Sequence, residues 1–312
     1  MEYRKKIYSS YISSHTLYLY GEITIEKIKK QFPVWKKYFG NFLPFNKEVN
    51  ILDIGCGEGG FVYFLQTLGY KNSEGIDISE EQVEKGVKLG IPNIKCADVN
   101  KFLKGKEEIY DIIFARDVIE HFKKDEILDI LELIYKSLKQ NGILVIKTPN
   151  AESPLGSRYR YWDFTHEISF TRSSLNQVLK SAGFREIEFY PAGPVPKGFR
   201  STIRFLLWKI ITFFIKFYLI IETGAGGGNI YPEYNSGCKK IKKYKIAFLI
   251  SHPIQYFSPL FKEMAKCPCI DLNVYYCSDE SIRGMKDVGF GINLKWFFIC
   301  WQRKFGEGVL KN

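Results

Sequence analysis

A glycine-rich turn that follows an acidic residue is the part of this 312-residue chain best suited to bind a ligand. Asp53 lies at the end of an apolar run, and the turn after it contains Gly55, Cys56, Gly57 and Gly59. Glycine permits positive φ values and a close approach of the backbone to a ligand, which a Cβ atom would block. The helix expected next offers its free N-terminal N–H groups to the same ligand. These residue types predict a site for a nucleoside-like molecule.

The charge of Asp53 decides between two kinds of ligand. The glycines at positions 55, 57 and 60 also fit the G-x-G-x-x-G pattern of dinucleotide sites. A carboxylate two residues before the first glycine would repel a pyrophosphate, but it suits a ligand that carries an ammonium and a sulfonium group. We therefore favour a sulfonium methyl donor, and a nicotinamide cofactor is the alternative.

The run D-x-G-C-G-x-G-x-F, which begins at Asp53, resembles the first motif of class I S-adenosylmethionine-dependent methyltransferases. Asp77 ends the next expected strand, where an acid can accept both ribose hydroxyls of a nucleoside. The resemblance implies S-adenosyl-L-methionine as the cofactor, with its adenine near the end of the third strand. The expected donor contacts are Asp53, Gly55, Cys56, Gly57, Gly59, Asp77, Ile78, Asp98, Val99 and Arg116.

Strand and helix patterns alternate over residues 49–192, which indicates a parallel sheet with right-handed crossovers. The resemblance implies an α/β fold: a Rossmann-like, mostly parallel seven-stranded sheet with helices on both faces. Residues 1–48 are expected to form an amphipathic helical cap. Within residues 193–236, Pro232 falls just after the start of the expected last strand and removes a hydrogen-bond donor. We therefore predict a degenerate last strand that is short, frayed or lost.

The composition indicates a globular protein with reduced cysteines. Hydrophobic residues make up 46% of the chain, which is ample for a core. Residues 1–10 contain no apolar run, so we expect no secretory signal. The seven cysteines form no C-x-x-C pair. Reduced thiols in a cytoplasmic protein therefore fit better than a zinc site.

The positive charge is concentrated around an apolar helix expected at residues 203–221. Ten Lys or Arg face two acids from Lys197 to Lys245, which supplies +8 of the net charge of +11. Lys209 and Lys216 each cost about 2.5–3.5 kcal/mol near a bilayer centre, which disfavours a spanning helix. They share one narrow stripe with Thr212, which suits an anionic membrane surface. The alternative is a helix packed on the sheet edge, and no nucleic-acid module is present.

Two histidines are candidate general bases for a hydroxyl acceptor. His166 follows the fifth strand, where this fold places acceptor residues, and Asp163 is expected to orient it; alternatively, His166 only fixes its loop. His121 closes the run Asp117-x-x-Glu120-His121. This run resembles one of ubiquinone-type O-methyltransferases that can hold a divalent ion. We favour the alternative that the run opens a helix, with Asp117 as its cap and Glu120 near its dipole, and we predict no metal site.

Two further segments suggest the acceptor. Residues 149–162 are rich in arginine and aromatic side chains, which suit a sugar or a phosphorylated acceptor. The alternative is a mobile lid that orders over bound donor. Residues 244–295 resemble the start of a family-4 GT-B glycosyltransferase, with a strand expected from Lys245, a turn and helix over 251–261 and a second strand from Asp271. Residues 243–312 contain only an incomplete βαβ segment.

The predicted function is O-methylation of a small-molecule or glycan acceptor, a sugar or a lipid-linked glycan, near the cytoplasmic membrane face. We expect no nucleic acid as a partner. Two alternatives remain: a catalytically impaired fusion remnant and a nicotinamide-dependent oxidoreductase.

Overall fold

The computed structural model describes residues 2–11, 21–154, 156–224, 233–241, 244–250, 263–264, 266, 270–276, 286–287, 292–293 and 301–305. It divides into two compact units, Met1–Lys240 and Ile241–Asn312. Each unit is described by itself.

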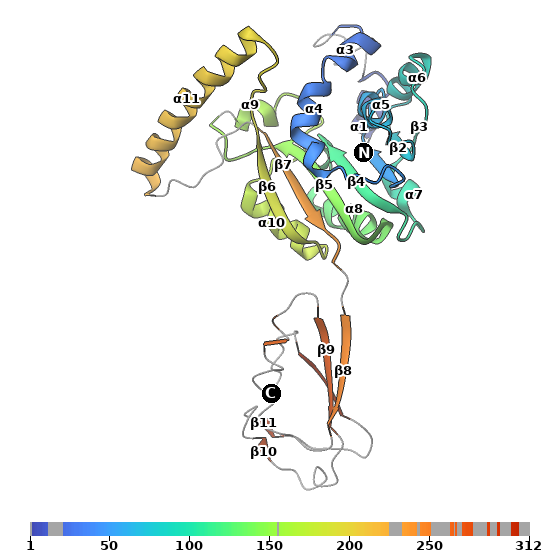
Figure 1. Cartoon of the computed structure of the whole chain (residues 1–312), viewed down its shortest axis with the longest axis vertical. Helices are drawn as coiled ribbons and strands as arrows, with labels where there is room; N and C mark the ends of the chain where they lie inside the picture. The colour runs from blue at the N-terminus through green and yellow to red at the C-terminus, as the bar shows by residue number, and fades with distance from the viewer. Residues whose placement is uncertain are drawn as a thin grey trace. The chain divides into compact units, whose positions relative to one another are not determined.

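A seven-stranded sheet organises the first unit, with the order β3-β2-β1-β4-β5-β7-β6 (Figure 1). β7 runs antiparallel to both of its neighbours, and the other strands are parallel to one another. This arrangement confirms the predicted fold class. The strands are β1 Ile51–Ile54, β2 Ser73–Asp77, β3 Ile94–Cys96, β4 Tyr110–Arg116, β5 Leu138–Pro149, β6 Arg185–Ala192 and β7 Glu233–Lys239.

Helices cover both faces of this sheet (Figure 1). Several begin at a side chain that accepts a backbone N–H group, such as Thr171 before α10 and Asp98 before α7. The helices and 3-10 turns are α1 Glu2–Tyr8, α3 Ile25–Lys29, α4 Phe32–Phe39, η2 Gly40–Phe42, α5 Gly60–Thr67, α6 Glu80–Lys88, α7 Val99–Leu103, η3 Ile119–His121, α8 Lys124–Ser137, α9 Gly156–Arg160, α10 Arg172–Ser181 and α11 Phe199–Thr223.

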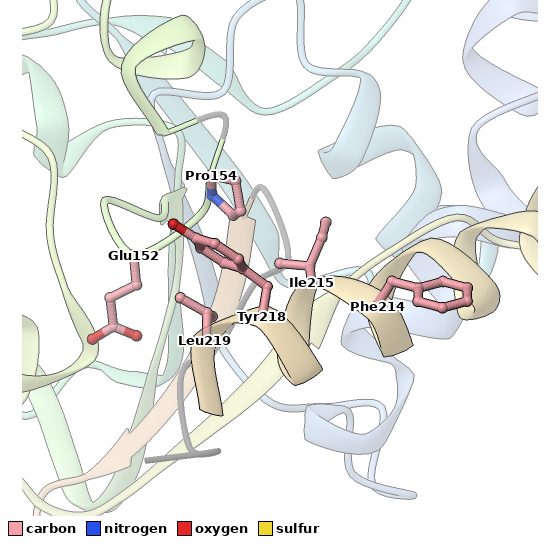
Figure 2. A pocket seen from close by; sticks show the side chains of 6 residues that line it. All are labelled: Glu152, Pro154, Phe214, Ile215, Tyr218 and Leu219. Carbon is pink, nitrogen blue, oxygen red and sulfur yellow. The ribbon is translucent and has the colours of Figure 1, made fainter. Parts of the chain in front are cut away.

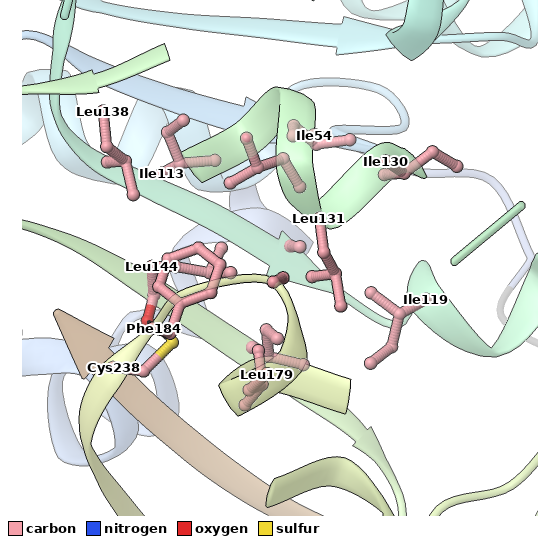
Figure 3. Packing of buried hydrophobic residues seen from close by; sticks show 14 of the residues in the cluster. Ile54, Ile113, Ile119, Ile130, Leu131, Leu138, Leu144, Leu179, Phe184 and Cys238 are labelled. Atoms are coloured by element: carbon pink, nitrogen blue, oxygen red, sulfur yellow. Dashed lines mark hydrogen bonds between the residues drawn. The ribbon is translucent and has the colours of Figure 1, made fainter. Parts of the chain in front are cut away.

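The central strands are apolar on both sides because each face packs against helices. On one face, Ile113 and Leu144 pack against Leu131 of α8 and Leu179 of α10 (Figure 3). On the other face, α4 and α5 supply an aromatic cluster that includes Phe39, Phe61 and Phe64, packed on Phe114. These two layers fix the carboxyl ends of β1, β4 and β5, where the functional residues lie.

The last strand is complete, so the predicted degenerate strand within 193–236 is wrong. β7 pairs with β5 from Glu233 to Lys239 and also with β6. Pro232 precedes the strand and therefore removes no ladder hydrogen bond from it. Gly237 fits closely under the N-terminal cap, since an added Cβ atom would lie 2.4 Å from Cε1 of Phe42. The methyl-donor unit thus extends to Lys240.

The basic apolar helix α11 exposes most of its large hydrophobic side chains. Thr212 faces inward and is buried, whereas Lys209 and Lys216 are exposed, so the three do not share one surface stripe as predicted. None of the helices in the described ranges has both the length and the apolar character needed to span a bilayer. The exposed hydrophobic residues are Phe199, Ile203, Leu206, Leu207, Ile210, Ile211, Phe213, Phe214, Phe217, Tyr218, Ile220 and Ile221.

The second unit contains the two strands predicted near residues 245 and 271. β8 (Tyr244–Ile250) pairs in parallel with β9 (Ile270–Tyr276). β12 (Trp301–Phe305) adds antiparallel to β9, and β10 (Lys286–Asp287) pairs with β11 (Ile292–Asn293). The turn and helix predicted over 251–261 lie outside the described residues.

Candidate active site

The glycine turn after β1 has a backbone that only glycine adopts readily. Gly55, Gly57 and Gly59 have φ values of 69°, 56° and 78°. A Cβ atom at Gly55 would lie 2.2 Å from Cγ2 of Val118, so the close packing also excludes a side chain. Gly59 then precedes α5, whose free N–H groups lie at this edge of the sheet. The turn is therefore shaped for contact with a ligand through its backbone.

Asp77 connects this turn to the end of β2. Its Oδ2 accepts the N–H of Gly57 at 2.9 Å, and its Oδ1 accepts the N–H of Ser79 at 2.8 Å. Each carboxylate oxygen keeps a further lone pair for a ribose hydroxyl. Ile78, directly beside it, exposes 51% of its surface, as a residue that lies against a planar base would. This geometry fits the predicted nucleoside end of the donor.

Asp53 is fully buried and bonded to Arg116. The Nε–H group of Arg116 donates a hydrogen bond to Oδ1 at 3.2 Å, and an Nη2–H group donates one to Oδ2 at 2.9 Å. The guanidinium also lies 4.0 Å from the ring centroid of Phe61. Burial raises the pKa of Asp53, and the neighbouring Arg116 opposes this shift. The carboxylate predicted to face the donor thus has an internal cationic partner, while Arg116 remains slightly exposed, at 13% of its side chain.

Three other expected donor contacts have local structural roles. The Cys56 side chain is buried against Gly75, where an added Cβ atom would lie 2.8 Å from its Sγ. Asp98 caps α7 by accepting the N–H of Lys101 at 3.0 Å, and Val99 packs into the core. The third strand therefore ends before the predicted Asp98–Val99. Any contact of these residues with the donor remains a prediction.

On the acceptor side, a hydrogen-bonded chain joins His121 of η3 to Asp163 in the loop after α9. The Nδ1 atom of His121 lies 2.8 Å from Oγ1 of Thr165, and that hydroxyl lies 2.6 Å from Oδ1 of Asp163. The backbone N–H of Thr165 donates to the same oxygen at 2.8 Å. The Tyr11 hydroxyl donates to the other carboxylate oxygen. The loop and the N-terminal segment therefore meet at this carboxylate.

His166 lies beside this chain. Its ring centroid is 4.7 Å from that of His121, and its Nδ1 lies 3.1 Å from the carbonyl oxygen of Tyr159. The Asp163 carboxylate contacts Thr165 and Tyr11, and the carbonyl oxygen of Asp163 accepts the backbone N–H of His166 at 3.2 Å. Orientation of the His166 ring by Asp163 remains a prediction. The structure brings the two predicted histidines together and joins the His121 ring to the Asp163 carboxylate through the Thr165 hydroxyl.

Burial keeps both imidazoles neutral near pH 7. Desolvation, followed by the charge of His166, lowers the pKa of His121 to about 4. Desolvation also lowers the pKa of His166, despite the opposing charge of Asp163. For Asp163, burial favours the neutral form, but hydrogen bonds from Thr165 and Tyr11 outweigh it and lower the pKa. The ionised Asp163 carboxylate is therefore joined through Thr165 to the neutral imidazole of His121.

Asp117 forms an ion pair rather than a helix cap. Its carboxylate oxygens lie 2.7 and 2.9 Å from Nζ of Lys147, which also contacts Glu233 at 2.8 Å. Asp117 has a φ of 55°, and α8 begins only at Lys124, so the prediction that this run opens a helix is wrong. The ion pairs link the ends of β4, β5 and β7.

Glu120, His121 and His166 each offer a ligand atom within 4.8 Å of the other two. Oε2 of Glu120 accepts the hydroxyl of Thr148 at 3.0 Å, and Oε1 has no hydrogen-bond partner within the described ranges. Burial raises the pKa of Glu120 well above its ordinary value, which favours the protonated form. A neutral Glu120 does not require a metal ion to balance its charge. The donor types would suit a divalent ion. The Asp117 of the predicted run is not available, because it binds Lys147.

The N-terminal cap covers the acceptor side. Arg4 of α1 binds Glu126 at 2.8 Å and Glu167 at 3.2 Å. The ring of Tyr8 lies 6.4 Å from that of His121, and its carbonyl accepts the Ser79 hydroxyl at 3.0 Å. Tyr8, Tyr11 and Thr165 were not predicted as site residues.

Comparison with known proteins identifies the family of the first unit. The sequence profile of a methyltransferase-domain family matches residues 28–188, just over half of the chain. The chain belongs to this family. It is an S-adenosylmethionine-dependent methyltransferase with a class I fold. The nicotinamide alternative is thereby set aside.

Relatives of this methyltransferase differ in acceptor. It is 27% identical over 164 residues to phosphoethanolamine N-methyltransferase 3 of Arabidopsis thaliana, covering 48% of this chain and 32% of that protein. It is 30% identical over 136 residues to ribosomal RNA small subunit methyltransferase G of Malacoplasma penetrans, covering 38% and 54%. The match thus spans about a third to a half of these curated relatives. A solved Archaeoglobus fulgidus methyltransferase shares the fold, with a TM-score of 0.50, 22% identity, and 69% and 97% coverage.

A separate groove lies between α11 of the methyltransferase and the loop after β5. Its volume is about 430 Å³, and none of the predicted catalytic residues lines it. Figure 2 shows the mainly hydrophobic lining, with the Glu152 carboxylate at one side. Oε1 of this carboxylate accepts the N–H of Arg172 at 3.1 Å. The lining residues are Glu152, Pro154, Phe214, Ile215, Tyr218 and Leu219.

Proposed function

We propose that this methyltransferase O-methylates a sugar or a lipid-linked glycan. The observation that carries the proposal is the exposed aromatic loop next to the histidine pair: Tyr161, Trp162 and Phe164 expose 78%, 43% and 82% of their surfaces. Arg158 lies 5.4 Å from the ring centroid of Trp162. Exposed rings and planar guanidinium groups provide stacking surfaces and donors for a polyhydroxylated acceptor.

S-adenosylmethionine, when bound, supplies a methyl group on an electrophilic sulfonium. The residues of the chain then have two tasks: to hold the acceptor hydroxyl in line with that methyl group, and to take the hydroxyl proton. The O–H group becomes strongly acidic as the O–CH3 bond forms and the S–CH3 bond breaks, so a weak base is sufficient. The neutral imidazoles of His121 and His166 are suited to this task.

Two further features support a glycan or lipid-linked acceptor. The second unit resembles the start of a family-4 GT-B glycosyltransferase, which suggests that the chain works with glycan-building enzymes. The groove along α11 offers an apolar surface for the lipid part of a lipid-linked sugar. The paired β7 also argues against an impaired remnant with a damaged last strand.

A small phosphorylated amino alcohol is the second candidate acceptor. Two of the curated Arabidopsis relatives are named phosphoethanolamine N-methyltransferases. The same histidines could take a proton from an ammonium group before methylation. The two candidates differ in the methylated atom, oxygen or nitrogen.

The acceptor class can be tested with isotopically labelled donor. We expect the full-length protein to transfer labelled methyl groups to pooled cell-envelope glycans, and mass spectrometry should show methyl ethers that are missing from cells without the protein. Transfer to phosphoethanolamine instead would favour the second candidate. Donor binding without transfer to either would favour the impaired remnant.

We also propose that α11 binds an anionic membrane surface on the cytoplasmic side. At about 100° per residue, Leu206, Ile210 and Phe217 point away from the buried Thr212. By the same rotation, Arg200 and Arg204 flank this apolar stripe on one side, and Lys209 and Lys216 flank it on the other. An apolar stripe between two basic flanks fits a helix lying at head-group level.

The variant Lys209→Glu plus Lys216→Glu should lose most of its association with vesicles that contain phosphatidylserine. Each basic residue near such a surface contributes about 1 kcal/mol, so replacing two cations by anions should weaken binding more than tenfold. Vesicle flotation measures this effect. The matched control Lys95→Glu plus Lys101→Glu, away from α11, should float like the wild type. Equal flotation of both double variants would contradict the proposal.

A further inference from the structure

We propose that Thr165 is a positioning residue that fixes the tautomer of His121, and that His121 rather than His166 takes the acceptor proton. This inference rests on the proposed function and assigns the base within it. It requires His121, Thr165 and Asp163 to act as one hydrogen-bonded unit. Their side chains come from two segments that meet only in the folded protein.

The protons of this unit can be assigned from its donors and acceptors. An ionised carboxylate only accepts hydrogen bonds, so the Thr165 hydroxyl, 2.6 Å from Oδ1 of Asp163, must donate its single proton to it. Nδ1 of His121 lies 2.8 Å from the same hydroxyl. Because the hydroxyl proton is already committed to Asp163, Nδ1 must carry a proton and donate it to Thr165. Nε2 of a neutral His121 is then left with its lone pair.

The two histidines differ in the group that each Nδ1 atom contacts. Nδ1 of His166 faces the carbonyl oxygen of Tyr159 at 3.1 Å, which also fixes a tautomer. The charge of Asp163 acts on both rings, and His121 is also joined to Asp163 by hydrogen bonds through the Thr165 hydroxyl. When His121 takes up a proton, its ring becomes a cation that is hydrogen-bonded to the Thr165 hydroxyl, and that hydroxyl is bonded to the Asp163 carboxylate. With the ring centroids 4.7 Å apart, only one of the two imidazoles can hold the charge readily.

Methyl transfer and proton transfer occur together at the acceptor hydroxyl. The acceptor oxygen forms its bond to the methyl carbon, the S–CH3 bond breaks to release S-adenosylhomocysteine, and the hydroxyl proton moves to Nε2 of His121. That proton passes to water after the product leaves. No proton moves through Thr165, because its role is to orient the ring and to transmit the charge of Asp163.

Nitrogen-15 NMR of the full-length protein, labelled at histidine, tests the tautomer directly. We expect His121, assigned with a His121→Gln variant, to show a protonated Nδ1 and an unprotonated Nε2 at pH 7. Thr165→Val should lose this preference, and Thr165→Ser should keep it. A protonated Nε2 in the wild type would overturn the inference, whatever acceptor the enzyme uses.

Kinetics test the role of the unit in transfer. Thr165→Val should lower kcat about 10- to 100-fold, which is less than the loss of a general base because the His121 imidazole remains, while the affinity for S-adenosylhomocysteine stays unchanged. Thr165→Ser should restore kcat to within about threefold, because it keeps the hydroxyl. His166→Gln should cost less than His121→Gln. A fully active Thr165→Val, or a larger loss from His166→Gln, would contradict the assignment.

A metal ion would give a different result. If the purified protein carries a stoichiometric divalent ion that shifts the Nε2 resonance of His121, and a chelator reverses the shift, His121 is a ligand and the inference is wrong. An unchanged spectrum with chelator supports it. If Thr165→Val fails to fold, the wild-type tautomer and the Thr165→Ser kinetics still decide the question.

Discussion

Replacing Arg116 with methionine should lower the free energy of unfolding by about 3–5 kcal/mol, because it leaves the buried carboxylate of Asp53 without its cation. The Asp53 side chain is fully shielded from solvent, and both of its oxygens accept hydrogen bonds from Arg116. Chemical denaturation of the wild type and variant measures the change. Arg200→Met, on the exposed surface of α11, is the matched control and should change stability by less than about 0.5 kcal/mol.

The double variant Asp53→Leu plus Arg116→Met should recover most of the lost stability, because an apolar pair needs no ionic partner. The single variant should also depend on pH. Without Arg116 the pKa of Asp53 rises further above that of the unfolded chain, so stability is lost as pH increases through that interval. The defect of Arg116→Met should therefore be larger at pH 8 than at pH 5. A neutral effect of Arg116→Met at both pH values would contradict this account of the pair.

Replacing Asp77 with alanine should weaken S-adenosylhomocysteine binding by at least about 100-fold. Two hydrogen bonds from ribose hydroxyls to a carboxylate would be lost, each worth about 1.5–3 kcal/mol. The change also frees the N–H groups of Gly57 and Ser79, so the shape of the turn would suffer as well. Isothermal titration calorimetry measures the affinity.

Two variants show whether the Asp77 effect is specific. Asp77→Asn keeps one acceptor oxygen and the side-chain shape, so its loss should be intermediate. Glu84→Ala removes an exposed carboxylate on the neighbouring α6, paired only with Lys88 at 3.6 Å, and should bind like the wild type. Wild-type affinity in Asp77→Ala would show that the ribose contact is elsewhere.

Most of the sheet could be predicted because its strands are short apolar runs bounded by glycine, acids or turns. β1 and β4 follow this rule closely, whereas β6 alternates charged and apolar residues. β7 does not follow it, since Asn235 and Ser236 are polar yet fully buried. Its position depends on pairing between β5 and β6, which cannot be read from its own residue types. The start of α7 was readable, because Asp98 three residues before Lys101 has the spacing of a helix cap.

The donor site was easier to predict than the acceptor site for a related reason. Gly55, Gly57 and Asp77 belong to a local pattern with fixed spacing around one turn. Thr165 and His121 are 44 residues apart, and threonine is too common to mark a site. Their contact depends on how η3 and the loop after α9 pack together. The acidic type of Asp163 marked it as a candidate, but its hydrogen bond with Thr165 could not be read from the sequence.

The central claim is that the glycine turn binds a methyl donor. Calorimetric titration of the wild-type protein with S-adenosylhomocysteine, followed by NADH under the same conditions, tests this most directly. We expect saturable binding of S-adenosylhomocysteine at a single site and no heat of binding with NADH. Absence of S-adenosylhomocysteine binding, or saturable binding of NADH in its place, would contradict it.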